Sequence, residues 1–146
     1  MAIVTDFQKV YRHKQVDFER KLLKELSIHN IESMIAEYFD SFLKPLSIYK
    51  QTISDMCLDY AIESYLLGAS YGRLGYYDGE SAKSAFKKSS SRFKTLLDDL
   101  YDFWMFGFHA DDLMYESLYM ACEGFMYYWW TDGFEQTVRR YRLRLH

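Results

Sequence analysis

The chain has 146 residues, a formal net charge of −3 and 49% hydrophobic residues, with 19% aromatic residues overall. A chain of this length can fold as one domain without a disulfide or a metal, and this composition excludes a disordered chain. The net charge gives no general attraction to nucleic acid or to an anionic membrane, and no apolar run reaches the roughly 20 residues of a membrane span. We expect one cytoplasmic domain over residues 1–146, with no signal peptide and no membrane contact.

Apolar residues recur every three or four positions, which predicts an all-α helical bundle of five or six helices. The first helix is expected to begin at Thr5, because Thr5 and Gln8 form a capping box. Its apolar stripe consists of Phe7, Val10, Tyr11, Phe18, Leu22, Leu23 and Leu26. A break at residues 27–30 precedes a second helix, which stops before Pro45. The apolar face of that helix consists of Ile31, Met34, Ile35, Tyr38, Phe39, Phe42 and Leu43.

The third helix is expected to lie at the centre of the bundle. Ser47 is its predicted cap, and its core face consists of Ile53, Met56, Cys57, Tyr60, Ala61, Leu67 and Tyr71. Its other sides are also apolar, through Leu58, Ile62, Tyr65 and Leu66. A helix that is apolar nearly all round needs neighbours on every side. Three glycines within residues 72–79 then predict a helix end followed by a tight loop.

A fourth helix is predicted over residues 80–106, closed by Gly107, with a possible bend at the serines of residues 89–91. Its inward residues are Phe86, Phe93, Leu97, Leu100 and Trp104. The fifth begins at Asp111 or Asp112, where acids suit the positive helix end. Its predicted inward stripe is Leu113, Ser117, Met120, Ala121, Gly124, Phe125 and Tyr128. Two alternatives follow: a short sixth helix from Asp132, or one unbroken helix to about Arg144.

Few residues point to catalysis or metal binding. Asp55, Asp59 and Glu63 are spaced four apart on one helix, which favours a solvated acidic face over a cation site. Cys57 and Cys122 fall within apolar helical patterns, so we expect buried reduced thiols. We predict no catalytic residue, no metal and no cofactor.

Ser64, Gly68 and Gly72 place small residues on one helix face. Such a stripe either lets another helix approach closely or leaves room for a ligand, and tight packing is favoured. The alternative function is an enzyme that uses a small molecule or a metal, with its site between the third helix and residues 73–80. Its ligand-binding residues would be Gly68, Gly72, Arg73, Tyr76 and Tyr77.

Two basic clusters stand out. One consists of Lys83, Lys87, Lys88, Arg92 and Lys94, and the other of Arg139, Arg140, Arg142 and Arg144. Basic residues at a helix C-terminus offset its dipole, which gives the second cluster a structural role. Either cluster would suit an acidic partner or RNA, but the negative net charge makes nucleic acid unlikely as a partner.

Four consecutive aromatic residues, Tyr127, Tyr128, Trp129 and Trp130, form the strongest recognition signal. On a helix they spread through about 300° of arc, so one face of a small bundle cannot bury all four. Exposed aromatic surface marks contact with a second subunit or a partner protein. The leading prediction is a non-enzymatic interaction or regulatory protein that self-associates as a homodimer through these four residues.

The segments DYAIESYLLG (59–68), YGRLGYY (71–77), GES (79–81) and LLKELS (22–27) are similar to a family of small bacterial proteins of unknown function, the YbaK-like proteins. The resemblance implies a bacterial cytosolic protein with a helical fold. It supplies no catalytic residue that could be assigned to this chain.

Overall fold

The computed structural model describes residues 17, 20, 23–24, 26–46, 48–107 and 112–143. These residues form four long helices and one short helix, without a strand among them, which confirms the all-α bundle. The helices are α2 (Ile28–Leu43), α3 (Lys50–Ser70), α4 (Gly72–Tyr77), α5 (Ala82–Gly107) and α6 (Asp112–Arg142). The helix predicted over residues 5–26 lies largely outside the described residues. From its stripe, Leu23 is exposed and Leu26 is half-buried.

Helix α2 begins where the sequence predicted a break. The Ser27 hydroxyl accepts a hydrogen bond from the Asn30 amide at 3.3 Å and caps the helix. The helix ends at Leu43, two residues before Pro45. Its predicted apolar face is confirmed, because Ile31, Ile35, Phe39, Phe42 and Leu43 are buried.

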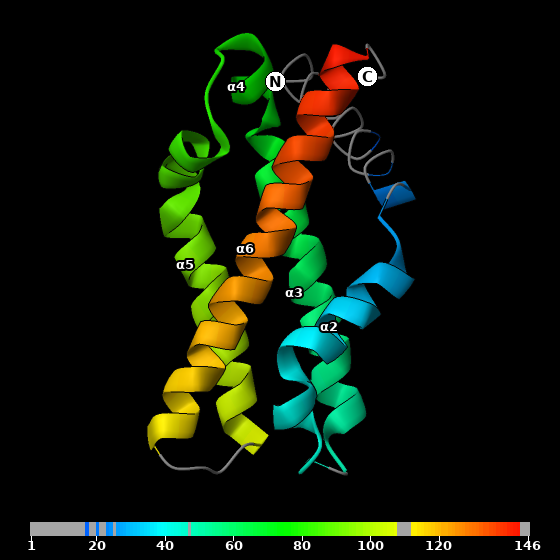
Figure 1. The fold of residues 1–146 in the computed structure, drawn as a ribbon, viewed down its shortest axis with the longest axis vertical. Coiled ribbons are helices and arrows are strands. Elements are labelled where there is room, and N and C mark those ends of the chain that lie inside the picture. Colours follow the sequence, from blue (N-terminus) through cyan, green and yellow to red (C-terminus); the bar gives the residue numbers. More distant parts are fainter. Residues whose placement is uncertain are drawn as a thin grey trace, which may run out of the picture.

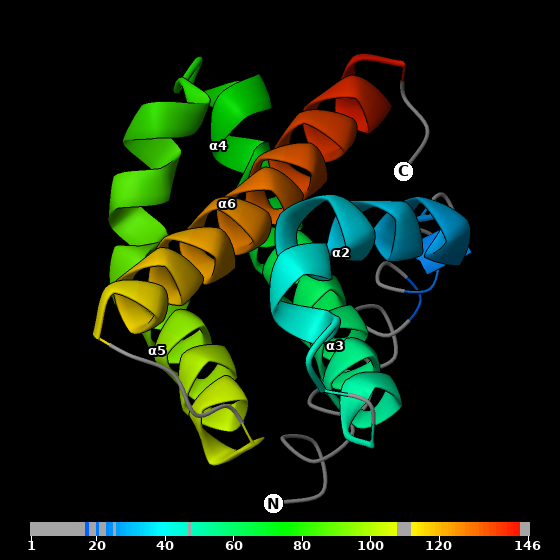
Figure 2. The ribbon, with the colours of Figure 1, turned by 60° about the horizontal axis from the view of Figure 1, so that its bottom comes forward.

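Helix α3 contacts α2, α4, α5 and α6, which confirms its central position. It begins at Lys50 with Tyr49 at the N-cap, whereas the predicted cap, Ser47, lies outside the described residues. Figures 1 and 2 show α6 lying across α3, with α5 on one side and α2 on the other. Because α6 also contacts all four other helices, the bundle has two central helices.

The two central helices touch backbone to backbone. Gly68 of α3 lies against the carbonyl group of Trp130, and Gly133 of α6 lies against the carbonyl group of Tyr65. Ser64 lies on the same face, and its hydroxyl donates a 2.6 Å hydrogen bond to the carbonyl oxygen of Met126. The small residues of α3 therefore allow close helix packing, as the sequence favoured.

The prediction of a loop over residues 72–79 is wrong, because Gly72–Tyr77 forms the helix α4. In this helix, glycine allows close contact with α6 and is not needed for an unusual backbone conformation. A Cβ at Gly72 would lie 2.5 Å from Thr137, and one at Gly75 would lie 2.6 Å from the Phe134 ring. Only at Gly79 does the turn use the left-handed region, with φ of 68°.

Helix α5 ends at Gly107 as predicted. Phe93, Leu97, Leu100 and Trp104 are buried and Phe86 is half-buried, which confirms the inward face. The Ser89 hydroxyl donates to the Phe86 carbonyl at 3.0 Å, which is the local hydrogen bonding expected of serine inside a helix.

Helix α6 runs unbroken through Asp132, so the alternative of one long helix is confirmed and the short sixth helix is wrong. The capping pattern at residues 132–135 is overridden because Gly133 packs on α3 within the helix. The predicted inward stripe is also wrong in part, since four of its residues are exposed: Leu113, Ser117, Met120 and Tyr128. The buried face consists of Leu118, Cys122, Phe125, Met126, Trp129, Trp130, Gly133, Phe134 and Thr137.

Candidate functional site

Helix α6 carries a row of exposed apolar side chains, which we call the outer stripe: Leu113, Met120 and Tyr127. They are spaced seven residues apart, so they share one side of the helix. Leu113 is 73% exposed, Met120 is 67% exposed and Tyr127 is 40% exposed. Ser117 and Gly124 fall between them and are small, but a Cβ at Gly124 would lie 3.0 Å from the Tyr38 ring of α2. The outer stripe is therefore an exposed apolar surface, although its third residue, Tyr127, also packs on the Phe86 ring with centroids 4.9 Å apart.

The four consecutive aromatic residues divide between the inside and the outside of the bundle. Trp129 and Trp130 are 2% and 0% exposed, so they offer no surface to a partner. Trp130 stacks on Phe134 with ring centroids 5.5 Å apart. Tyr127 and Tyr128 are 40% and 42% exposed. Of the four predicted interface residues, the two tyrosines remain available, and their interface role stays a prediction.

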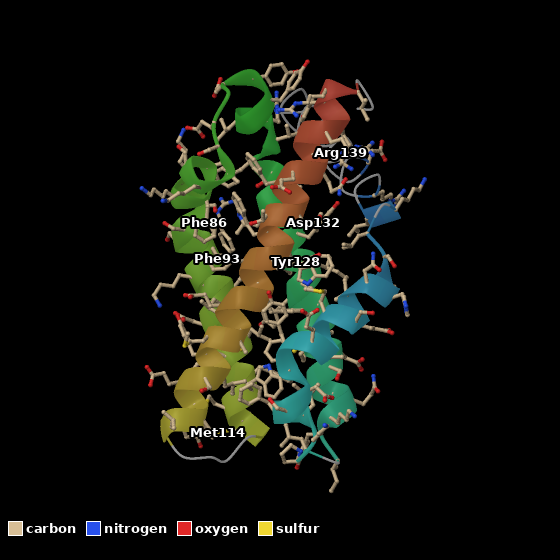
Figure 3. The ribbon with its side chains drawn as sticks, in the orientation of Figure 1. Phe86, Phe93, Met114, Tyr128, Asp132 and Arg139 are labelled. Carbon is tan, nitrogen blue, oxygen red and sulfur yellow. The ribbon has the colours of Figure 1, made fainter. Side chains whose placement is uncertain are left out.

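A second feature is a groove between α2 and α6, which we call the α2–α6 groove. Its volume is about 670 Å³. Its walls consist of Leu26, Ser27, Asn30, Ser33, Met34, Tyr65, Tyr128, Trp129, Asp132, Gln136, Arg139, Arg140 and Leu143. Figure 3 shows Tyr128, Asp132 and Arg139 following one another along α6, on the side toward α2.

Asp132 is a half-buried acidic residue in the wall of this groove. Burial raises the pKa of its carboxyl group, and the charge of Glu135 acts in the same direction. A hydrogen bond with Gln136 and the positive charge of Arg139 oppose that rise. Burial also raises the pKa of the Tyr128 hydroxyl, to which the Asp132 charge contributes. The groove thus holds a carboxylic acid, Asp132, and a cation, Arg139, about two turns apart on one helix.

Trp129, one of the residues around the groove, carries an unpaired donor. The Trp129 indole N–H is buried and finds no hydrogen-bond acceptor among the described residues. Leaving such a donor unpaired costs about 1–3 kcal/mol. The unpaired Trp129 N–H is therefore a cost to the folded state, as far as the described residues show.

A third feature is a smaller groove of about 510 Å³ between α5 and α6. Phe86, Phe93, Leu97, Tyr119 and Tyr127 make it apolar, and Lys94 and Glu123 lie at its rim. Figure 3 shows Phe86 and Phe93 on α5, across α6 from Asp132. Because Tyr127 belongs to both features, this groove continues the outer stripe.

Comparison with known proteins places the chain in a family. The family described as "Protein of unknown function (DUF2521)" matches residues 1–146. The chain belongs to the DUF2521 family. It is also 33% identical over 147 residues to the "Uncharacterized protein YbaK" of Bacillus subtilis (strain 168), with 99% of each chain covered. No solved structure matches it. These matches confirm the predicted resemblance to small uncharacterised bacterial proteins.

In this DUF2521 member, the residues predicted to bind a ligand have different surroundings, and their ligand-binding role stays a prediction. They are Gly68, Gly72, Arg73, Tyr76 and Tyr77. Gly68 and Gly72 lie against α6, so the helix fills the room beside them. Tyr76 instead stacks on Tyr141 with centroids 5.6 Å apart, and Tyr77 packs on both rings. Arg73 is exposed.

The charged clusters are mostly solvated. Asp55, Asp59 and Glu63 are exposed, and the described residues hold no group of three or more acids, histidines or cysteines placed for a metal ion. In the first basic cluster, Lys88 pairs with Glu80 at 2.5 Å. Within that same described part of the chain, no helix is long and apolar enough to cross a membrane.

The two cysteines are free and buried in this DUF2521 member, as predicted. Burial raises the pKa of the Cys57 thiol to about 12, although a hydrogen bond with Trp104 opposes the rise. Burial also raises the pKa of the Cys122 thiol. Neither sulfur has the thiolate character of a nucleophile.

Sequence reasoning missed the α2–α6 groove. A signal was present, because Tyr128, Asp132 and Arg139 are spaced four and seven apart and share one side of a continuous helix. The signal disappears if a helix boundary is drawn at Asp132, as one of the two alternatives did.

Proposed function

We propose that this DUF2521 member is a non-enzymatic interaction protein that self-associates as a homodimer through the outer stripe. The observation that carries the proposal is the exposure of Leu113, Met120 and Tyr127 on one side of α6. Burying a leucine or methionine side chain fully is worth about 1.5–3 kcal/mol, so a second copy that covers the stripe gains a substantial driving force.

The surroundings of the stripe also suit a helix–helix contact. Ser117 is small and exposed, so a second helix can approach the stripe beside it. Gly124 does not add to this space, because the Tyr38 ring of α2 lies against it. Tyr127 and Tyr128 extend the exposed surface, and tyrosine is a residue type enriched at the energetic centres of interfaces. Trp129 and Trp130 contribute from inside, because their burial fixes the helix turn that presents the tyrosines.

The proposal includes a bacterial cytoplasmic location. Cys57 and Cys122 are both free and buried, and unpaired thiols are typical of proteins in a reducing compartment.

Charge placed on the stripe tests the proposal. We expect Met120→Glu to abolish the homodimer, because association would bury an unpaired carboxylate. Sedimentation velocity and light scattering across a concentration series measure the state of association. Thermal unfolding followed by circular dichroism checks that the variant still folds, as it should at so exposed a position.

Ile48→Glu is the matched control. Ile48 is an exposed apolar residue between α2 and α3, and the change adds the same charge away from the stripe. This control should remain a dimer. A wild-type chain that stays monomeric throughout, or a Met120→Glu variant that dimerises as well as the Ile48→Glu control, contradicts the proposal.

A further inference from the structure

We infer that the two copies of the homodimer pack so that the lysines of α5 in each copy face the glutamates of α6 in the other. This inference rests on the proposed function and specifies the surface that the second copy covers. That surface includes the groove of about 510 Å³ between α5 and α6, with Lys94 and Glu123 at its rim. Because Tyr127 belongs to both the groove and the outer stripe, a second copy on the stripe also reaches the groove.

The relative height of α5 and α6 decides which residues can meet in such a dimer. The two helices run side by side in opposite directions (Figure 1). Near one end, the Phe86 ring of α5 packs on the Tyr127 ring of α6, with centroids 4.9 Å apart. Toward the other end, the Tyr101 hydroxyl of α5 donates a 3.4 Å hydrogen bond to the Tyr115 carbonyl of α6. These contacts fix the height of each α5 residue against α6.

Charged side chains form one row on each helix beside the groove. Lys87 and Lys94 are seven residues apart on α5, and Glu116 and Glu123 are seven residues apart on α6. Residues at this spacing share one side of a helix, and all four side chains are exposed. One row is positive and the other is negative. Because a second copy presents the same two rows, the surface is complementary to itself in charge.

A two-fold axis that passes between Lys94 and Glu123 matches both rows at once. These two residues line the same groove and lie at about the same height. The axis reverses the second copy, so that Lys94 faces Glu123 of the second copy and the reverse contact also forms. Lys87 then faces Glu116 of the second copy, because both rows advance by seven residues. Sliding one copy by seven residues would leave only one of the two lysines opposite a glutamate.

The same arrangement covers the middle of the outer stripe. Met120 lies within one turn of Glu123, so it falls over Ser90 of the second copy, a small exposed residue that lines the groove. The methionine thereby reaches the apolar lining of that groove. Lys94 also pairs with Asp98 of its own chain at 3.0 Å. A lysine ammonium has three donors, so this pair leaves donors for Glu123 of the second copy.

Lys87 and Glu116 give the sharpest test, because they lie far apart within one chain. Lys87 follows Phe86, whose ring packs on Trp130 with centroids 5.1 Å apart. Glu116 precedes Trp130 by four turns of α6, which is about 20 Å along the helix. An ion pair between these two residues can therefore form only between copies.

We expect Lys87→Glu and Glu116→Lys each to weaken the dimer at least tenfold at low ionic strength. In either variant, like charges meet at both symmetric contacts. An equimolar mixture of the two variants should form a heterodimer about as tight as the wild-type dimer. In the mixture, a chain with two negative positions meets a chain with two positive ones. Sedimentation velocity with a fluorescent label on one variant measures the heterodimer, and its recovery shows that both variants fold.

Arg92→Glu is the matched control. Arg92 is exposed on α5 and lies almost opposite Lys94 around the helix, so the change reverses a charge away from the groove. This variant should dimerise like the wild type. Mixed with Glu116→Lys, it should give no more heterodimer than the wild type does.

The outcomes separate this inference from self-association. Charge-reversed variants that dimerise like the wild type, or a mixture as weak as its components, overturn the inference. If Met120→Glu still breaks the dimer in that case, self-association through the outer stripe stands with a different arrangement of the two copies. A wild-type chain that stays monomeric overturns both.

Discussion

The inner and outer faces of α6 use the same helix in opposite ways. On the inner face, Gly133 and the Trp130 backbone meet α3 with no side chain between the helices. On the outer face, Leu113 and Met120 project from the helix and remain exposed. Both faces carry apolar residues at helical spacing. Small residues, rather than the largest apolar ones, therefore mark the side on which two helices cross closely.

The largest expected effect comes from breaking the inner face. We expect Gly68→Ala to lower the free energy of unfolding by roughly 3 kcal/mol or more, because the new Cβ would collide with the Trp130 carbonyl group. Backbone atoms cannot move aside as a flexible side chain does. Urea unfolding measures the change. By contrast, Met120→Ala on the outer face should change the stability of the monomer by less than about 0.5 kcal/mol.

Gly79→Ala separates collision from backbone strain. A Cβ at Gly79 would meet nothing within 4 Å, but its φ is +68°. The cost there should be about 1 kcal/mol, from backbone conformation alone. If Gly68→Ala costs no more than Gly79→Ala, the helices do not cross as closely as described.

Two buried polar residues near the contacts of α6 differ in whether their hydroxyl groups have a hydrogen-bond partner. The buried Ser64 hydroxyl has a partner in the Met126 carbonyl, at 2.6 Å, so Ser64→Ala should cost about 1 kcal/mol. The Thr137 hydroxyl is buried without a hydrogen-bond partner among the described residues. Thr137→Val keeps the shape and removes that unpaired group, so it should be neutral or stabilise by up to about 1 kcal/mol. Urea unfolding of both variants tests the pair. A loss of stability in Thr137→Val would show that its hydroxyl is satisfied.

The sequence predicted the buried faces of α2 and α5, because the large apolar residues of each helix lie on one side. For α3 it predicted the central position but only part of the buried face, since Tyr60 and Leu67 are half-buried whereas Gly68 is buried against α6. It failed on α6, where Leu113 and Met120 continue an apolar period that packing does not use. It also failed at residues 72–79, because glycine promotes both turns and close helix contact, and Gly72 serves the second role. The candidate groove forms where one particular turn of α2 lies opposite Asp132 of α6. No local sequence pattern specifies which turns of these two helices meet.

The smallest expected effect concerns Asp132, at the border between the two faces. Burial is the largest cause of its shift and raises its pKa above the ordinary value of 3.8, so the folded state holds this proton more tightly than the unfolded state. Protonation therefore favours folding, and the associated stability is lost as pH rises from 3.8 through the raised value. Asp132→Asn removes that loss. The variant and the wild type should be equally stable in acid, and the variant should be slightly more stable at neutral pH. Urea unfolding at both pH values measures the difference, and the effect is small because the side chain remains partly exposed. A less stable variant at neutral pH would mean that attraction to Arg139 and the hydrogen bond with Gln136 outweigh the cost of burying the carboxylate. Asp132 would then be stabilised in its charged form, as a solvated residue is.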